Sequence, residues 1–143
     1  MDITRGFPLD RPRIDLKWGL TEQGFLELLT ECGPQKITNG HYEMRCRFFG
    51  LPESVVHFHF EPRTNGRLCE IEFFRKPKRQ KKKGFDQLQL ALEKYLGPPT
   101  RRDHTRSVEL ESTYWRLGKV SVAHEYYYQF GQYEKILFKL GKA

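Results

Sequence analysis

Two histidines on either side of a phenylalanine, His57 and His59, are the residues of this 143-residue sequence whose spacing best suits a reactive site. Side chains at positions i and i+2 of a strand point to the same side, and paired imidazoles commonly bind metal ions. His41, His104 or a glutamate would complete such a ligand set. Histidines on an exposed strand are more often ordinary surface residues, so the sequence predicts no metal site and no cofactor.

The cysteines do not favour thiol chemistry. Cys32, Cys46 and Cys69 are odd in number and widely spaced, whereas a zinc site requires close pairs. Each falls where the apolar pattern faces the core, and a free cysteine in that position behaves as a small hydrophobic residue. The sequence therefore predicts three buried, reduced thiols rather than a catalytic thiolate, which needs a polar and partly open site.

Candidates for acid–base chemistry are equally weak. Glu109 and Glu111 fall on one side of a predicted strand, but nothing in the sequence predicts a pocket around them. His124 falls at an inward position and is expected to be a core histidine bonded to a neighbour. The chain contains no phosphate-binding loop, dinucleotide fingerprint, HExxH or GxSxG motif. These observations predict a protein that is not an enzyme and does not bind a small molecule.

The elements that position these residues occur twice in the same order. In each copy an amphipathic helix closed by Gly-Pro precedes three stretches of alternating apolar residues. Thr21 is the expected N-cap of the first helix, and the second begins near Phe85. The expected strands cover residues 41–49, 55–60 and 68–74 in the first copy and residues 108–114, 120–128 and 136–140 in the second, with a further short strand at residues 13–18.

This order predicts a single α+β domain over residues 1–143, with pseudo-repeats at residues 21–74 and 85–140 joined by a basic linker at residues 75–83. The tandem α-β-β-β units are expected to form a curved, mainly antiparallel sheet of six or seven strands with two helices on one face. No apolar run approaches the roughly 20 residues of a membrane helix, and no signal peptide is expected at the N-terminus. A cytoplasmic location without a membrane partner follows.

The opposite parity of each strand is expected to face solvent, where charges of both signs surround a few aromatic residues. Aromatic and arginine side chains anchor protein interfaces, so this face favours a protein partner. An ordinary solvated sheet surface with cross-strand charge pairs is the alternative interpretation. The candidate protein-binding residues are Arg45, Arg47, Phe49, Phe74, Trp115 and Tyr127.

Residues 75–83 carry the strongest local charge, with seven cations and no anion. Because the formal net charge is +7, the rest of the chain has no net charge. Such a run either contacts nucleic acid through phosphates or is a solvated linker. The candidate nucleic-acid-binding residues are Arg75, Lys76, Lys78, Arg79, Lys81, Lys82 and Lys83, with Arg101, Arg102 and Arg106 as an extension.

The closure Leu96-Gly97-Pro98-Pro99-Thr100, followed by Tyr114-Trp115 on the next strand, resembles the tandem α-β repeat of the BamE and β-lactamase-inhibitor-protein type, and Cys32-Gly33-Pro34 is its counterpart in the first copy. The resemblance implies a sheet that grips another protein. The chain departs from that family in lacking a signal peptide and a lipoprotein cysteine, which argues against an envelope role. Small intracellular immunity proteins use comparable α/β sheets. The leading expectation is a protein-binding module of the inhibitor or immunity type, and the alternative is a nucleic-acid-binding protein.

Overall fold

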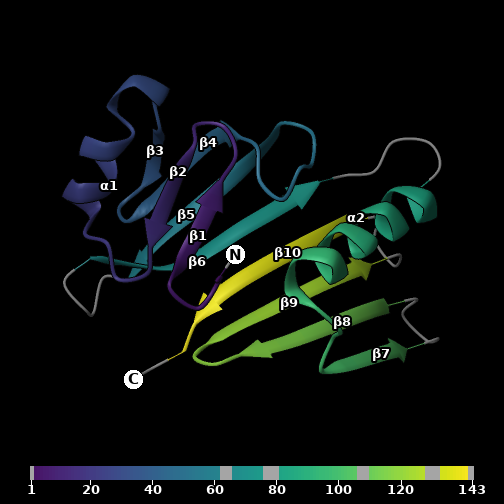
Figure 1. Ribbon diagram of the computed structural model, residues 1–143. Coiled ribbons are helices and arrows are strands. Elements are labelled where there is room, and N and C mark those ends of the chain that lie inside the picture. The colour runs from purple at the N-terminus through teal and green to yellow at the C-terminus, as the bar shows by residue number, and fades with distance from the viewer. Residues whose placement is uncertain (1, 62–65, 76–80, 106–109, 128–132, 142–143) are drawn as a thin grey trace.

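The structure is a computed structural model that describes all residues except 1, 62–65, 76–80, 106–109, 128–132 and 142–143 (Figure 1). The strands in chain order are β1 (Gly6–Leu9), β2 (Ile14–Lys17), β3 (Gln35–Thr38), β4 (His41–Cys46), β5 (Ser54–Glu61), β6 (Arg67–Arg75), β7 (Arg101–Thr105), β8 (Leu110–Leu117), β9 (Val120–Tyr127) and β10 (Tyr133–Leu140). The helices are α1 (Glu22–Leu28), which a 3-10 turn (Thr30–Cys32) follows, and α2 (Lys81–Leu96).

Eight strands form one open sheet in the order β3-β4-β5-β6-β10-β9-β8-β7, and every pairing between described strands is antiparallel. The α+β class and the antiparallel sheet are therefore confirmed. The expected count of six or seven strands is wrong, because the edge strands β3 and β7 were missed. Neither edge strand has the alternating apolar residues from which the other strands were predicted. Edge strands are often short and polar, because such edges do not readily pair with other chains.

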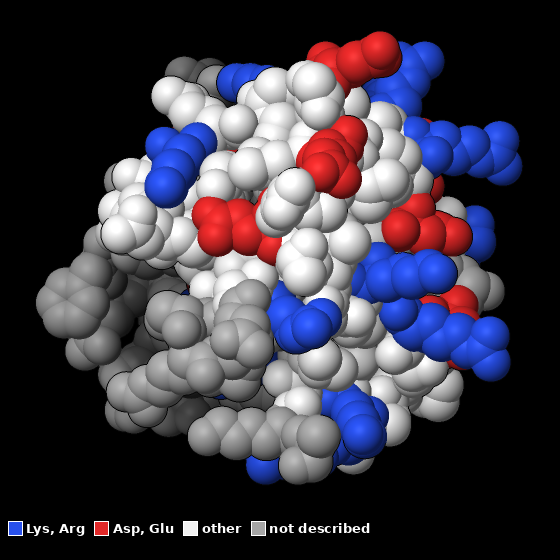
Figure 2. All heavy atoms as spheres, turned by 90° about the vertical axis from the view of Figure 1, so that its left-hand side faces the viewer, with Lys and Arg blue, Asp and Glu red and all other residues white. Residues whose placement is uncertain are grey.

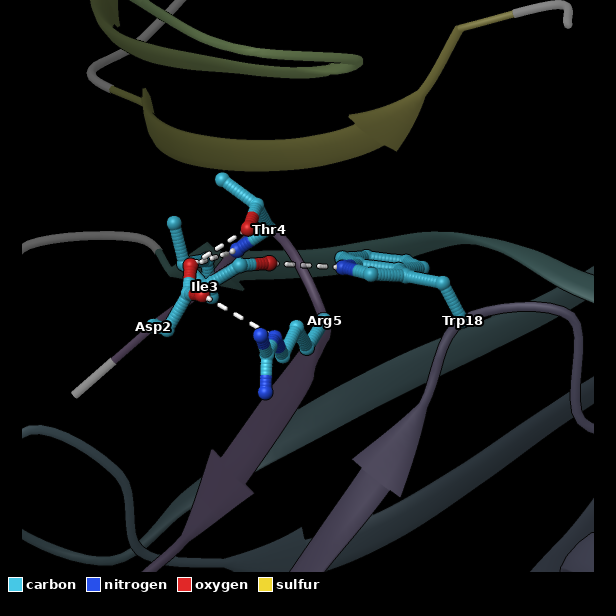
Figure 3. A network of polar contacts seen from close by, with 5 residues as sticks. All are labelled: Asp2, Ile3, Thr4, Arg5 and Trp18. Carbon is cyan, nitrogen blue, oxygen red and sulfur yellow. Dashed lines mark hydrogen bonds and ion pairs between the residues drawn. The ribbon is translucent and has the colours of Figure 1, made fainter.

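The N-terminal hairpin of β1 and β2 forms a separate two-stranded sheet that crosses in front of β5 and β6 (Figure 1). The strand expected at residues 13–18 is β2, whereas its partner β1 was not predicted. Phe7 of β1 is buried, and its ring centroid lies 5.4 Å from that of Phe48 and 4.9 Å from that of Phe138. The Trp18 indole donates a 2.8 Å hydrogen bond to the Ile3 carbonyl, which ties the preceding segment to the end of β2 (Figure 3).

The first helix is shorter than its apolar pattern predicts. The expected N-cap is confirmed, since the Thr21 hydroxyl accepts a 3.0 Å hydrogen bond from the Gly24 N–H. Phe25 is buried against Tyr42, Phe58 and Phe60, at centroid distances of 5.0–5.6 Å. The chain then tightens into the 3-10 turn, which changes the angular spacing of the side chains. The inward placement of Cys32 is therefore wrong: this cysteine is exposed, and Leu28 is 50% exposed.

The second helix begins four residues before Phe85, so Lys81, Lys82 and Lys83 belong to its first turn. Arg75 is the last residue of β6. The boundaries of the basic linker at residues 75–83 are therefore wrong, and the segment between these two elements lies outside the described residues. The expected end of α2 is confirmed at Leu96, where Gly97 follows with φ of +84°.

A buried polar group lies between α2 and the sheet. His124 Nδ1 lies 2.7 Å from Gln89 Oε1, and His124 Nε2 lies 2.9 Å from Glu134 Oε1. The Phe85 ring stacks on the imidazole at a centroid distance of 4.2 Å. All three polar side chains are buried, so the expectation of a hydrogen-bonded core histidine at position 124 is confirmed.

We expect His124→Leu to lower the free energy of unfolding by about 3 to 5 kcal/mol, because it removes a buried hydrogen-bonding partner of the Glu134 carboxylate. Replacing both His124 and Glu134 by leucine should recover part of this loss, since a buried polar pair can be exchanged for apolar side chains at little cost. Urea unfolding of both variants measures the difference. If the double variant is at least as unstable as His124→Leu, the loss of stability does not come from the broken contact between His124 and Glu134.

Candidate functional site

The candidate site is the face of the eight-stranded sheet that points away from the buried side chains, which we call the open face. Its residues alternate with buried ones along each strand and are half-buried or exposed. The packing contacts of Phe7, Phe25 and Phe85 involve sheet side chains of the other parity. The open face includes His41, Glu43, Arg45, Val55, His57, His59, Glu70, Glu72, Phe74, Tyr114, Arg116, Ser121, Ala123, Glu125, Tyr127, Tyr133, Lys135, Leu137 and Lys139.

Four of the six predicted protein-binding residues are accessible. Phe74 is 42% exposed, Arg45 and Arg47 are exposed, and Tyr127 is half-buried. The Phe74 and Tyr133 rings lie 5.4 Å apart, and Tyr127 is the cross-strand partner of Tyr133. These three rings form an aromatic strip across β6, β10 and β9.

The outward placement of Phe49 is wrong. This side chain is only 2% exposed, and its ring stacks on Tyr95 of α2 at a centroid distance of 5.0 Å and an interplanar angle of 16°. β4 ends at Cys46, and Phe49 adopts a left-handed φ of +52°, so strand alternation cannot be extended to it.

The outward placement of Trp115 is wrong for a different reason. The inward and outward residues of β8 are exchanged relative to the prediction, because Trp115 pairs with Val122 and is 1% exposed. Its indole N–H donates a 2.9 Å hydrogen bond to the Gly97 carbonyl, which satisfies the one polar group of the side chain. Tyr114 occupies the open face instead, where the Arg101 guanidinium lies 4.5 Å from its ring centroid.

A hollow of about 480 Å³ lies on the open face beside Tyr114. Ala123 lies between Tyr114 and Leu137 on the neighbouring strands, and its small side chain leaves the space unfilled. Arg101 and Arg116 line the rim. We call this feature the Ala123 hollow; sequence reasoning missed it, because its signal is a single alanine among larger outward residues.

Tyr127 of the aromatic strip is uncharged at physiological pH. Burial raises the pKa of the Tyr127 phenol well above its usual value, and a hydrogen bond to the Glu125 carboxylate adds to the shift. The phenol therefore donates to Glu125 and keeps its proton. It presents an apolar ring rather than a negative charge to a molecule on the open face.

A histidine and glutamate cluster lies on β4, β5 and β6 of the open face. His41 Nε2 lies 2.8 Å from His57 Nδ1, and the His41 ring stacks on the His59 ring at a centroid distance of 4.4 Å. Potential ligand atoms of His59, Glu70 and Glu72 all lie within 4.8 Å of one another. Within the described ranges, this is the group whose side chains could hold a metal ion.

The predicted basic residues are only partly described, since Lys76, Lys78, Arg79 and Arg106 lie outside the described residues. Arg101 pairs with Asp103 at 2.9 Å, and Arg102 pairs with Glu93. These two arginines follow the end of α2, whereas Lys81, Lys82 and Lys83 lie in its first turn, about 24 Å away for a helix of this length.

Charges of both signs are also mixed over the side of the molecule that carries α1 and β3 (Figure 2). Lys and Arg side chains there lie beside Asp and Glu side chains, with uncharged surface between them. The described residues on this side therefore do not form the continuous basic surface that phosphate binding requires.

The cysteines have three different environments. Cys46 is buried as predicted, and burial, followed by the charges of Glu53 and Cys32, raises the pKa of its thiol to about 12. Cys69 is half-buried, because a bulge near His59 moves Leu68 rather than Cys69 into the core. Because of its raised pKa, the Cys46 thiol stays protonated and cannot act as a nucleophile at neutral pH.

Comparisons of the chain with protein-family models, with curated proteins and with solved structures give no match. None of the helices in the described part of the chain is long and apolar enough to cross a membrane. The function has to be inferred from the geometry of the open face.

At pH 8 we expect Ellman's reagent to label Cys32 rapidly and Cys46 only after unfolding, because the Cys46 thiol is buried and stays protonated. Cys32→Ser should remove the fast phase, and urea should restore labelling of Cys46. Rapid labelling of Cys46 in the folded protein would contradict its placement in the core.

Proposed function

We propose that this chain is a non-enzymatic protein-binding protein of the inhibitor or immunity type, which holds its partner on the open face around the Ala123 hollow. The observation that carries the proposal is an apolar hollow with a cationic rim on the same face as three aromatic rings. Interfaces concentrate their binding energy in such pockets and aromatic side chains.

The proposal includes a tandem arrangement, in which two helix-and-strand units join edge to edge and both helices cover one face. Two observations support it. The order α1, β3–β6 is followed by α2, β7–β10, and the sheet order is symmetric about the β6–β10 pair. Phe25 and Phe85 also contact sheet residues of one parity, since cross-strand pairing places Phe58 and His124 on the same side. Each unit then contains four strands rather than the expected three, and the likeness to the BamE and β-lactamase-inhibitor-protein type stays a prediction.

The chemistry of the hollow specifies the partner. Its wall is mainly apolar, so it accepts a protruding apolar side chain, and burying one such side chain contributes about 1.5 to 3 kcal/mol. Arg101, Arg116 and the nearby Lys139 favour carboxylates around that anchor. We therefore propose a cytoplasmic protein whose contact surface carries an apolar anchor flanked by acidic residues.

Nucleic acid is the less favoured partner. The candidate cations that the structure describes are separated, since Arg101 and Arg102 follow the end of α2 whereas residues 81–83 form its first turn. No described feature brings the predicted basic residues into one surface.

Filling the hollow should weaken partner binding without disturbing the fold. We expect Ala123→Phe to raise the Kd at least tenfold, because the new ring occupies the space of the partner's anchor. The partner is first sought by cross-linking and among the products of adjacent genes, then purified, and its affinity is measured by calorimetry. Leu90→Phe is the matched control, since Leu90 is 67% exposed on α2 and away from the sheet. Equal affinities for the wild type and Ala123→Phe would remove the hollow from the interface.

A salt series separates the two partner classes. We expect a generic DNA duplex and a generic RNA to show no measurable binding at 50 mM salt, because the described candidate cations lie at opposite ends of α2 and do not form one basic surface. Fluorescence anisotropy measures this directly. Binding at 50 mM salt that falls by about 10³-fold or more at 200 mM would support the nucleic-acid alternative instead.

A further inference from the structure

We propose that His59, Glu70 and Glu72 form a binding site for a first-row divalent cation of the zinc class on the open face of β5 and β6. The proposal does not rest on the protein partner, because none of its three ligands lines the Ala123 hollow. It assigns metal binding to His59, whereas the sequence alone predicts that His57 and His59 are ordinary surface residues.

The sheet register brings the three side chains together. His59 is the cross-strand partner of Glu70, and Glu72 lies two residues further along β6 on the same side. Potential ligand atoms of all three lie within 4.8 Å of one another. In a tetrahedral site with metal–ligand distances near 2.1 Å, ligand atoms are about 3.4 Å apart, so small side-chain rotations complete the geometry.

The His59 imidazole is held in place and has an unused nitrogen. Its Nε2 atom is shielded from solvent and has no hydrogen-bond partner among the described residues. A buried polar atom without a partner costs free energy, which coordination to a metal ion would recover. The His41 ring stacks on the His59 ring at an interplanar angle of 22°, and His57 holds His41 through the 2.8 Å contact between their nitrogens. Glu43 lies 4.0 Å beyond, at the far side of His57.

The cluster can be reached from solvent. A cavity of about 600 Å³ lies beside His41, His59 and Glu70 and is also lined by Cys69 and Lys139. A hydrated ion therefore has a path to the ligands, which a metal site requires.

One cation already contacts the cluster. Lys135 Nζ lies 3.2 Å from Glu72 Oε2, and both side chains are half-buried. A bound metal ion must displace this ammonium group or share the carboxylate with it. Metal binding is therefore expected to compete with Lys135, a property that adventitious binding to surface histidines would not have.

The donor set selects the class of metal. One imidazole nitrogen with two carboxylates suits zinc and its neighbours, whereas Mg²⁺ and Ca²⁺ favour sites made of oxygen ligands alone. Three protein ligands leave at least one position for water or for a group from another molecule. Zinc is therefore the probe for the experiment, and Mg²⁺ is the matched control ion.

Calorimetric titration of the full chain with Zn²⁺ should show one saturable site, and Zn²⁺ should raise the Tm. We expect His59→Ala and Glu72→Gln each to weaken binding at least tenfold, while His104→Ala, an exposed histidine on β7, leaves it unchanged. Lys135→Met should tighten binding about fivefold, because it removes the competing ammonium group. Mg²⁺ should not bind.

Several results would overturn the proposal. One is the absence of saturable Zn²⁺ binding to the folded wild type. A second is undiminished affinity in His59→Ala, and a third is loss of binding in His104→Ala. If His57→Ala abolishes binding while His59→Ala does not, the ion binds to the His41 and His57 pair instead, and the assignment is wrong. Circular dichroism spectra and Tm values of the metal-free variants show whether each one folds, and Glu72→Gln preserves the side-chain shape if His59→Ala does not fold.

Discussion

The antiparallel pairing of β6 with β10 is the constraint on which the rest of the structure depends. It joins strands from the two halves of the chain in one register, with Ile71 opposite Phe138 and Phe73 opposite Ile136. Because side chains alternate along a strand, this register makes the buried side continuous from β4 to β8 and the open face equally continuous. A slip of β10 by one residue against β6 would place Lys135 in the core. The aromatic strip, the Ala123 hollow and the histidine cluster share one surface because of this pair.

The buried side is completed by segments that come from outside the sheet. α1 contributes Phe25 at one end, α2 contributes Phe85 at the other, and the N-terminal hairpin places Phe7 against Phe48 and Phe138. Phe7 thus contacts rings from both halves of the chain. The hairpin covers the buried side of the sheet near the pairing of β6 with β10, and Phe7 packs on Phe138 of β10. Core packing therefore stabilises the central strand pair.

Sequence reasoning succeeded where strands pack on one side only. On β5, β6, β9 and β10 the strict alternation identified buried residues such as Phe58, Ile71 and Val122. It failed where another force determines the side-chain direction. On β8 the Gly97 carbonyl accepts the Trp115 N–H and permits full burial of an indole, which exchanges the positions of Trp115 and Tyr114. An apolar pattern cannot predict the edge strands, because these strands lack alternating apolar residues. The Ala123 hollow could not be predicted either, because its walls come from neighbouring strands whose register the sequence alone does not give.

The same register links the two proposed sites. One row of cross-strand partners runs over the open face from His57 through Glu72 and Leu137 to Ala123, Tyr114 and Arg101. Lys135 lies in the adjacent row, between Phe74 and Glu125, and contacts Glu72 through its ammonium group. An ion that takes Glu72 from Lys135 leaves that ammonium beside Glu125, the carboxylate that accepts the Tyr127 phenol proton in a hydrogen bond. If an ion binds as proposed, the charge next to the aromatic strip would therefore depend on the occupancy of the histidine and glutamate cluster, and a protein held on the strip would experience that change through electrostatics alone.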